Sequence, residues 1–146
     1  MHPFPHHYVV NASVRPDGDV PLSCEGVRVI ESAPPKEFDG PGNQWSPEGL
    51  LTAAVADCFA LGFRAIAAAS KYLWVSLETS THGTLDRIEG KMRFTRFETN
   101  ARLHVPAGAD VERARRLLEK AEQTCLVANS LSSERLLTVE VVASTP

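Results

Sequence analysis

Three cysteines, Cys24, Cys58 and Cys125, are the residues of this sequence best suited to covalent chemistry. A cysteine is a nucleophile once its thiol ionises, and otherwise it behaves as a small apolar residue that fills space in a core. The odd number argues against a disulfide framework of the secreted type, and the absence of a C-x-x-C pair argues against a zinc ribbon or a thioredoxin-type motif. The residues alone therefore leave two interpretations open, a reactive thiol or an inert core residue.

The histidines near the N-terminus do not predict a metal site. His2, His6 and His7 are close in sequence, but no cysteine or carboxylate stands at ligand spacing around them. We therefore expect surface histidines and no bound metal.

The charge of the chain excludes some partners. Its 146 residues carry a formal net charge of −3, which is too mild to predict a nucleic acid or an anionic membrane as a partner. The basic cluster Arg113, Arg115 and Arg116 is interrupted by apolar residues and fits a solvated helix face. Residues 1–10 have prolines and histidines where a signal peptide has an apolar run, so we expect a cytoplasmic protein.

A long helix is predicted from Pro47 to about Tyr72. Ser46 is a favoured N-cap, Pro47 suits the first helical position, and Glu48 suits the first turn. The helix is apolar nearly all round, which indicates that sheet, other helices or a second subunit cover it. Its charged residues form one narrow stripe, which argues against a membrane span: Asp57, Arg64 and Lys71.

The remaining segments predict strands and a second helix. The predicted strands are residues 8–14, 26–31, 75–85, 91–105 and 136–142, with a turn at 16–18 and a hairpin loop at 86–90. Asp110 is a good N-cap for a helix over residues 111–128, whose apolar stripe includes Cys125. The order β-β-α-β-β-α-β predicts one α+β domain over residues 1–146 with a mainly antiparallel sheet.

Two segments resemble the OsmC/Ohr family of osmotically inducible and organic hydroperoxide resistance proteins. The first, SPEGLLTAAVADCF over residues 46–59, is similar to the Pro-Glu opening of the family's central helix, which ends in the peroxidatic cysteine followed by Phe. The second, AEQTCLVANSL over residues 121–131, is similar to the motif of the resolving cysteine, Ala-Glu-x-x-Cys followed by Val and Asn-Ser. The element order also matches, so the resemblance covers nearly the whole chain and implies an OsmC-like fold in an intertwined homodimer.

The resemblance implies a cysteine-based peroxidase. Cys58 would attack an organic hydroperoxide and become a sulfenic acid, which Cys125 would close into a disulfide. Arg15 is the nearest match to the family's arginine, which would favour the thiolate and bind the peroxide oxygens, and Glu48 would hold that arginine. Many relatives have Pro directly after the second cysteine, where this chain has Leu126.

The surroundings of the reacting thiol set the expected substrate. Apolar walls would favour alkyl or lipid hydroperoxides over hydrogen peroxide, and the residues expected to form these walls are Trp45, Phe38, Phe59 and Leu61. The chemistry needs no metal, flavin or haem, so we expect no cofactor. An external dithiol must reduce the disulfide, and the resemblance implies one of the lipoyl type.

Helix geometry separates two of the expected site residues. Glu48 and Cys58 are ten positions apart on one predicted helix, or roughly 15 Å along its axis at about 1.5 Å per residue. A glutamate side chain does not span that distance. If both residues serve one site, Glu48 must reach the Cys58 of another chain, so we expect a homodimer with two composite sites.

Two other functions fit the same residues. A non-enzymatic member of the fold would bind a small apolar ligand, with its cysteines as relics, and a redox sensor would use the disulfide to change a partner surface. Without the resemblance, Glu48 fits a helix acid that complements the dipole, and Arg15 fits a solvated turn residue. Cys24 is expected to have no role.

Overall fold

The computed structural model describes residues 1–145 and forms two compact units, Met1–Leu51 and Thr52–Pro146. We call them the N-terminal unit and the C-terminal unit and describe each by itself. Helix α1, Pro47–Ala69, begins in the first unit and continues in the second. The single domain over residues 1–146 stays a prediction.

The N-terminal unit contains a small antiparallel sheet. Its strands are β1 (Asn11–Ala12), β2 (Val20–Ser23) and β3 (Ile30–Ser32), with β2 in the centre. The predicted hairpin of residues 8–14 and 26–31 is therefore wrong, because the unpredicted β2 pairs with both neighbours. The cause is Pro21, since a proline in a strand removes a ladder donor and argues against a strand. In the structure Pro21 still lies in register with Glu31, and its carbonyl accepts a hydrogen bond from the Ser13 N–H at 3.3 Å.

The segment after β3 leads into α1 as an ordered loop. It contains a short 3-10 helix, η1 (Lys36–Phe38), and returns beside β3, where the Ala33 N–H donates to the Trp45 carbonyl at 2.9 Å. The side chain of Ser46 then caps α1, because its Oγ accepts from the Gly49 N–H at 3.0 Å. The predicted helix start is thus confirmed.

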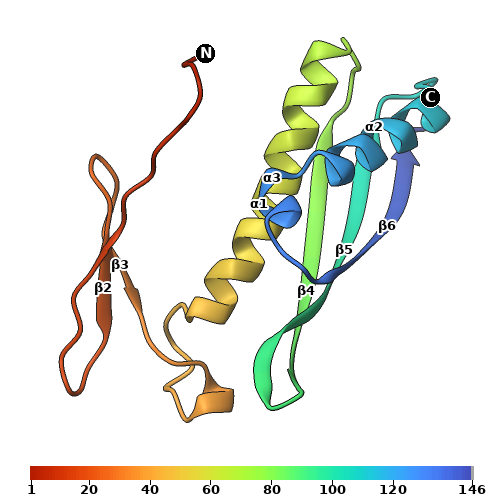
Figure 1. Cartoon of the computed structure of the whole chain (residues 1–146). Coiled ribbons are helices and arrows are strands. Elements are labelled where there is room, and N and C mark those ends of the chain that lie inside the picture. The colour runs from red at the N-terminus through yellow and green to blue at the C-terminus, as the bar shows by residue number, and fades with distance from the viewer. Residues whose placement is uncertain (146) are drawn as a thin grey trace. The chain divides into compact units, whose positions relative to one another are not determined.

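The C-terminal unit is built on a second three-stranded sheet (Figure 1). Its strands are β4 (Ser76–Ile88), β5 (Lys91–Val105) and β6 (Glu134–Ala143). The central strand β5 is antiparallel to β4 and parallel to β6. The β4–β5 connection is tighter than the predicted loop over residues 86–90, since Glu89 (φ 50°) and Gly90 (φ 78°) form a two-residue turn. Two positive φ angles are typical of the hairpin turn that matches the twist of the flanking strands.

The helices of the C-terminal unit pack on one face of its sheet (Figure 1). They are α1, which ends at Ala69, α2 (Val111–Gln123) and the short α3 (Leu126–Asn129). Alternate residues of β5 point into this layer and are buried, whereas Asn100 and Arg102 between them are exposed. The core residues are Phe59, Phe63, Ala67, Tyr72, Ala101, Leu103, Val105, Ala114, Leu118 and Ala121. The predicted α+β class is confirmed, and the strand pairings are mainly antiparallel when both sheets are taken together, with β5–β6 parallel.

Candidate active site

Two of the three cysteines meet in the C-terminal unit. Cys58 lies on α1 and is half-buried, while Cys125 lies between α2 and α3 and is 2% exposed. The two side chains lie close enough to interact, because Cys58 is among the groups that raise the pKa of Cys125. The structure therefore brings together the two thiols that the sequence motifs singled out. Cys24 is a free thiol in the N-terminal unit, directly after β2.

Cys58 is positioned by the regular helix α1. The buried residues of this helix, Val55, Phe59, Phe63 and Ala67, recur every four positions and fix its face against the core. Cys58 directly precedes one of these anchors and lies at the edge of the buried stripe. Its sulfur is therefore held in a defined place by the packing of its own helix.

Cys125 is positioned differently, at a break in the chain. The predicted helix over residues 111–128 is wrong here, because α2 ends at Gln123 and Cys125 has an extended backbone (φ −63°, ψ 105°) before α3 begins. Most of the predicted apolar stripe is nevertheless buried: Leu117 is partly buried, and four residues are at most 2% exposed, Ala114, Leu118, Ala121 and Cys125. Cys125 is therefore buried together with the stripe although its own backbone is not helical.

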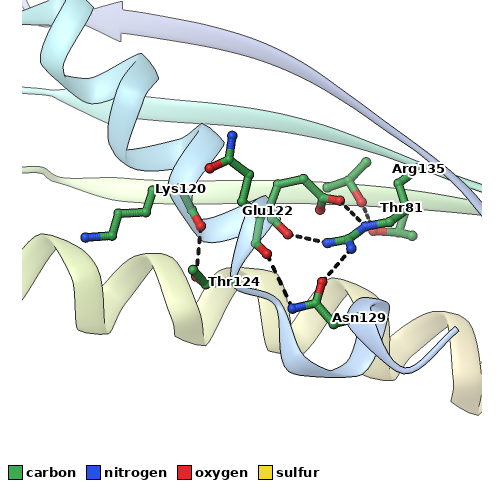
Figure 2. A network of polar contacts seen from close by, with 8 residues as sticks. Thr81, Lys120, Glu122, Thr124, Asn129 and Arg135 are labelled. Atoms are coloured by element: carbon green, nitrogen blue, oxygen red, sulfur yellow. Dashed lines mark hydrogen bonds and ion pairs between the residues drawn. The ribbon is translucent and has the colours of Figure 1, made fainter.

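A polar network explains why the helix stops (Figure 2). The guanidinium of Arg135 on β6 donates to the backbone carbonyl of Glu122, and the side-chain amide of Asn129 donates to the carbonyl of Gln123 at 3.3 Å. A continuing helix would use these two carbonyls for N–H groups four residues later. Instead, the Glu122 carbonyl accepts from Arg135 and from the Cys125 N–H at 3.3 Å, and the Gln123 carbonyl accepts from Asn129, so the chain turns out of the helix just before Cys125.

The surroundings of Cys125 keep its thiol protonated. Burial raises the pKa of Cys125 most strongly, and the hydrogen bond with Cys58, the nearby Cys58 sulfur and the Glu122 carboxylate raise it further. The backbone N–H of Ala128 acts in the opposite direction. A raised pKa leaves the Cys125 thiol protonated at neutral pH, which suits a second, resolving thiol better than an attacking one.

The family model described as OsmC-like protein matches residues 40–140 of this chain. The chain belongs to the OsmC-like family. This confirms the resemblance inferred from the two cysteine motifs, both of which lie inside the matched residues.

Individual OsmC-like relatives are similar over nearly their whole length. YmaD, an uncharacterised protein of Bacillus subtilis (strain 168), is 24% identical over 139 residues, which are 92% of this chain and 93% of YmaD. The OsmC-like protein VCA0330 of Vibrio cholerae, of unknown function, has a TM-score of 0.85 at 17% identity and covers 93% of this chain and 100% of its own. An organic hydroperoxide resistance protein from Elizabethkingia anophelis, solved with thiocyanate bound, has a TM-score of 0.75 at 21% identity, covering 97% and 99%. These likenesses establish the OsmC-like fold.

Four of the expected site residues of this OsmC-like chain belong to the N-terminal unit. Glu48 and Phe38 line an apolar cavity of about 480 Å³ within that unit. Trp45 is 53% exposed, and Arg15 is exposed between β1 and β2. Their participation in one site with the cysteines stays a prediction.

The two apolar residues expected beside Cys58 have different surroundings. Phe59 has no exposed surface and packs in the core cluster, and its role as a pocket wall stays a prediction. Leu61 is 46% exposed on α1. It stays a candidate for a wall that a substrate or a second chain would cover.

The polar residues that hold the Cys125 loop were not predicted. Glu122 and Asn129 stand in the second motif, so their spacing around Cys125 was visible, but nothing in the sequence connected them with Arg135 on the following strand. Within residues 1–145, no group of three or more His, Cys, Asp or Glu side chains is arranged to hold a metal ion.

Proposed function

We propose that this OsmC-like protein is a thiol-dependent peroxidase that reduces organic hydroperoxides to alcohols. The observation that carries the proposal is the proximity of the Cys58 and Cys125 thiols within the C-terminal unit. Family membership and the similarity to a protein described as conferring organic hydroperoxide resistance support the same function.

The reaction needs only the two sulfurs, a hydroperoxide and a dithiol. The Cys58 thiolate attacks the distal peroxide oxygen, so an S–O bond forms, the O–O bond breaks, and the alkoxide takes a proton and leaves as alcohol. The Cys125 sulfur then attacks the sulfenic sulfur, loses its proton, and releases the oxygen as water. An external dithiol, of the lipoyl type by family resemblance, restores both thiols by disulfide exchange and becomes a disulfide itself.

The active form in this proposal is a homodimer in the cytoplasm. Helix α1 is long and apolar enough in composition to cross a membrane, a property that core helices of soluble proteins share. Only 22% of its most apolar window is buried within one chain. A second copy of α1 is the natural cover for that surface. The dimer also supplies each Cys58 with the partner's Glu48, because the length of α1 keeps Glu48 away from the Cys58 of its own chain.

The primary test is consumption of cumene hydroperoxide or t-butyl hydroperoxide in the presence of dihydrolipoamide. The wild-type chain is expected to turn over, and Cys58→Ser is expected to fall to the uncatalysed rate. Mass spectrometry after one equivalent of peroxide should find a Cys58–Cys125 disulfide. Activity of Cys58→Ser equal to wild type would remove the proposal, and unmodified thiols would favour the ligand-binding alternative.

Subunit complementation tests the composite site. Cys58→Ser and Glu48→Gln chains, each inactive alone, are mixed after reversible unfolding so that mixed dimers form. If Glu48 serves the Cys58 of its partner, each mixed dimer regains one intact site, and the sample recovers about a quarter of wild-type activity. Absence of recovery in dimers shown to be mixed by native mass spectrometry would contradict the shared site.

A further inference from the structure

We infer that Arg135 is a positioning residue that sets Cys125 for disulfide closure. The inference rests on the proposed peroxidase function and deepens it. It concerns the second chemical step only, in which the Cys125 sulfur replaces the oxygen of the Cys58 sulfenic acid.

The guanidinium of Arg135 binds the chain on both sides of Cys125 (Figure 2). Before Cys125, it donates to the Glu122 carboxylate at 2.6 Å and to the Glu122 backbone carbonyl. After Cys125, it donates to the Asn129 Oδ1 at 2.6 Å. Asn129 in turn donates to the Gln123 carbonyl at 3.3 Å. The loop that carries Cys125 is thus held at both of its ends from one strand, β6.

The position of Arg135 makes this arrangement stiffer than an ordinary surface ion pair. The side chains of Arg135 and Glu122 are only 28% and 17% exposed, so their hydrogen bonds are less weakened by solvent. Arg102 and Glu140, on the same sheet, lie 3.5 Å apart and are 52% and 63% exposed. The planar guanidinium also presents several donors in fixed directions, which a lysine ammonium does not.

Disulfide closure depends on this stiffness. A disulfide requires the two sulfurs to approach to about 2.05 Å in a narrow range of dihedral angles. A loop that departs from this geometry forms the disulfide more slowly. A second hydroperoxide can then oxidise the Cys58 sulfenic acid to sulfinic acid. By holding Glu122 and Asn129, Arg135 favours closure over that irreversible oxidation.

The test separates the two chemical steps in single turnover. Reduced protein without dithiol is mixed with one equivalent of cumene hydroperoxide, quenched at intervals by alkylation and by dimedone, and analysed by mass spectrometry. Arg135→Gln is expected to form sulfenic acid at the wild-type rate but to close the disulfide roughly tenfold or more slowly. With excess peroxide it is expected to accumulate Cys58 sulfinic acid. Arg135→Lys keeps the charge but not the fork, and is expected to resemble Arg135→Gln.

Two further variants keep the test decisive. Arg102→Gln removes an exposed arginine of the same sheet and is expected to close at the wild-type rate. Asn129→Ala removes an exposed partner of Arg135, and is expected to slow closure in the same direction even if Arg135→Gln fails to fold. Wild-type closure rates in folded Asn129→Ala and Arg135→Gln would overturn this inference alone. A wild-type chain that forms no disulfide would overturn the proposed function, and this inference with it.

Discussion

The two sulfurs of the candidate site are held by opposite means. Cys58 lies within an uninterrupted helix whose buried face, Phe59 and Phe63 included, packs in the core. Cys125 lies where a helix has been interrupted, and polar side chains from β6 and α3 hold the loop. Cys58 thus has an apolar support, and Cys125 has a polar one.

The difference matches what each step of the proposed reaction requires of the fold. An attacking thiol needs a fixed place beside a substrate, which a packed helix provides. A resolving thiol must reach its partner and form a new bond, which suits a short loop with defined anchors. The predictions below test the apolar support of Cys58 and the polar support of Cys125 separately.

Serine substitutions of the two cysteines should give the largest difference in peroxide turnover. Cys58→Ser is expected to lose more than about a thousandfold in peroxide turnover, since no nucleophile remains. Cys125→Ser is expected to reduce about one equivalent of peroxide per chain and then stop, with Cys58 left as sulfenic or sulfinic acid. Peroxide consumption and intact-protein mass spectrometry measure both. Continued turnover of Cys125→Ser at the wild-type rate would contradict its resolving role.

Truncation of the apolar support should lower stability. Phe63 has no exposed surface and packs edge-on against Trp74 with ring centroids 5.2 Å apart. Phe63→Ala is expected to reduce the free energy of unfolding by about 3–5 kcal/mol, as measured by urea denaturation. Arg64→Ala, on the exposed side of the same helix, is the control, with an expected change within about 0.5 kcal/mol. Equal losses in the two variants would argue against core support of Cys58.

The pH dependence of disulfide closure should follow the ionisation of the buried Cys125 thiol. Because burial raises the pKa of Cys125, its thiolate is scarce at neutral pH and increases through and above the range where an ordinary thiol ionises. The rate of disulfide closure is therefore expected to rise about tenfold per pH unit from neutrality through the range where an ordinary thiol ionises, measured by rapid quench after a fixed peroxide pulse. A rate that levels off near neutral pH would contradict a protonated Cys125.

The helix caps should give the smallest effects. Ser46→Ala removes the acceptor for the Gly49 N–H at the start of α1, and Asp110→Ala removes the acceptor for the Arg113 N–H at the start of α2. Each is expected to cost about 1 kcal/mol in the free energy of unfolding, while disulfide closure stays at the wild-type rate. Thermal unfolding and the quench assay measure the two quantities. Slower closure in Asp110→Ala would show that the start of α2, and not only the Arg135 contacts, positions Cys125.

Local signals in the sequence predicted the regular elements well. The Ser46 and Asp110 caps and the residue bounds of β5 agree with the structure, because caps and strand alternation depend on neighbouring residues. The prediction failed in the N-terminal sheet, where Pro21 concealed a central strand, and at Cys125.

The sequence by itself determined the family, the α+β class and the identity of the two thiols, since these follow from motifs and from the periodicity of apolar residues. Only the tertiary structure decided that the sulfurs meet and that the second helix ends before Cys125. The reason is physical: the carbonyls of Glu122 and Gln123 would bond within a helix if left to their neighbours, but Arg135 and Asn129 bind them once the chain has folded. That competition involves a residue on another strand, and no local pattern reveals it.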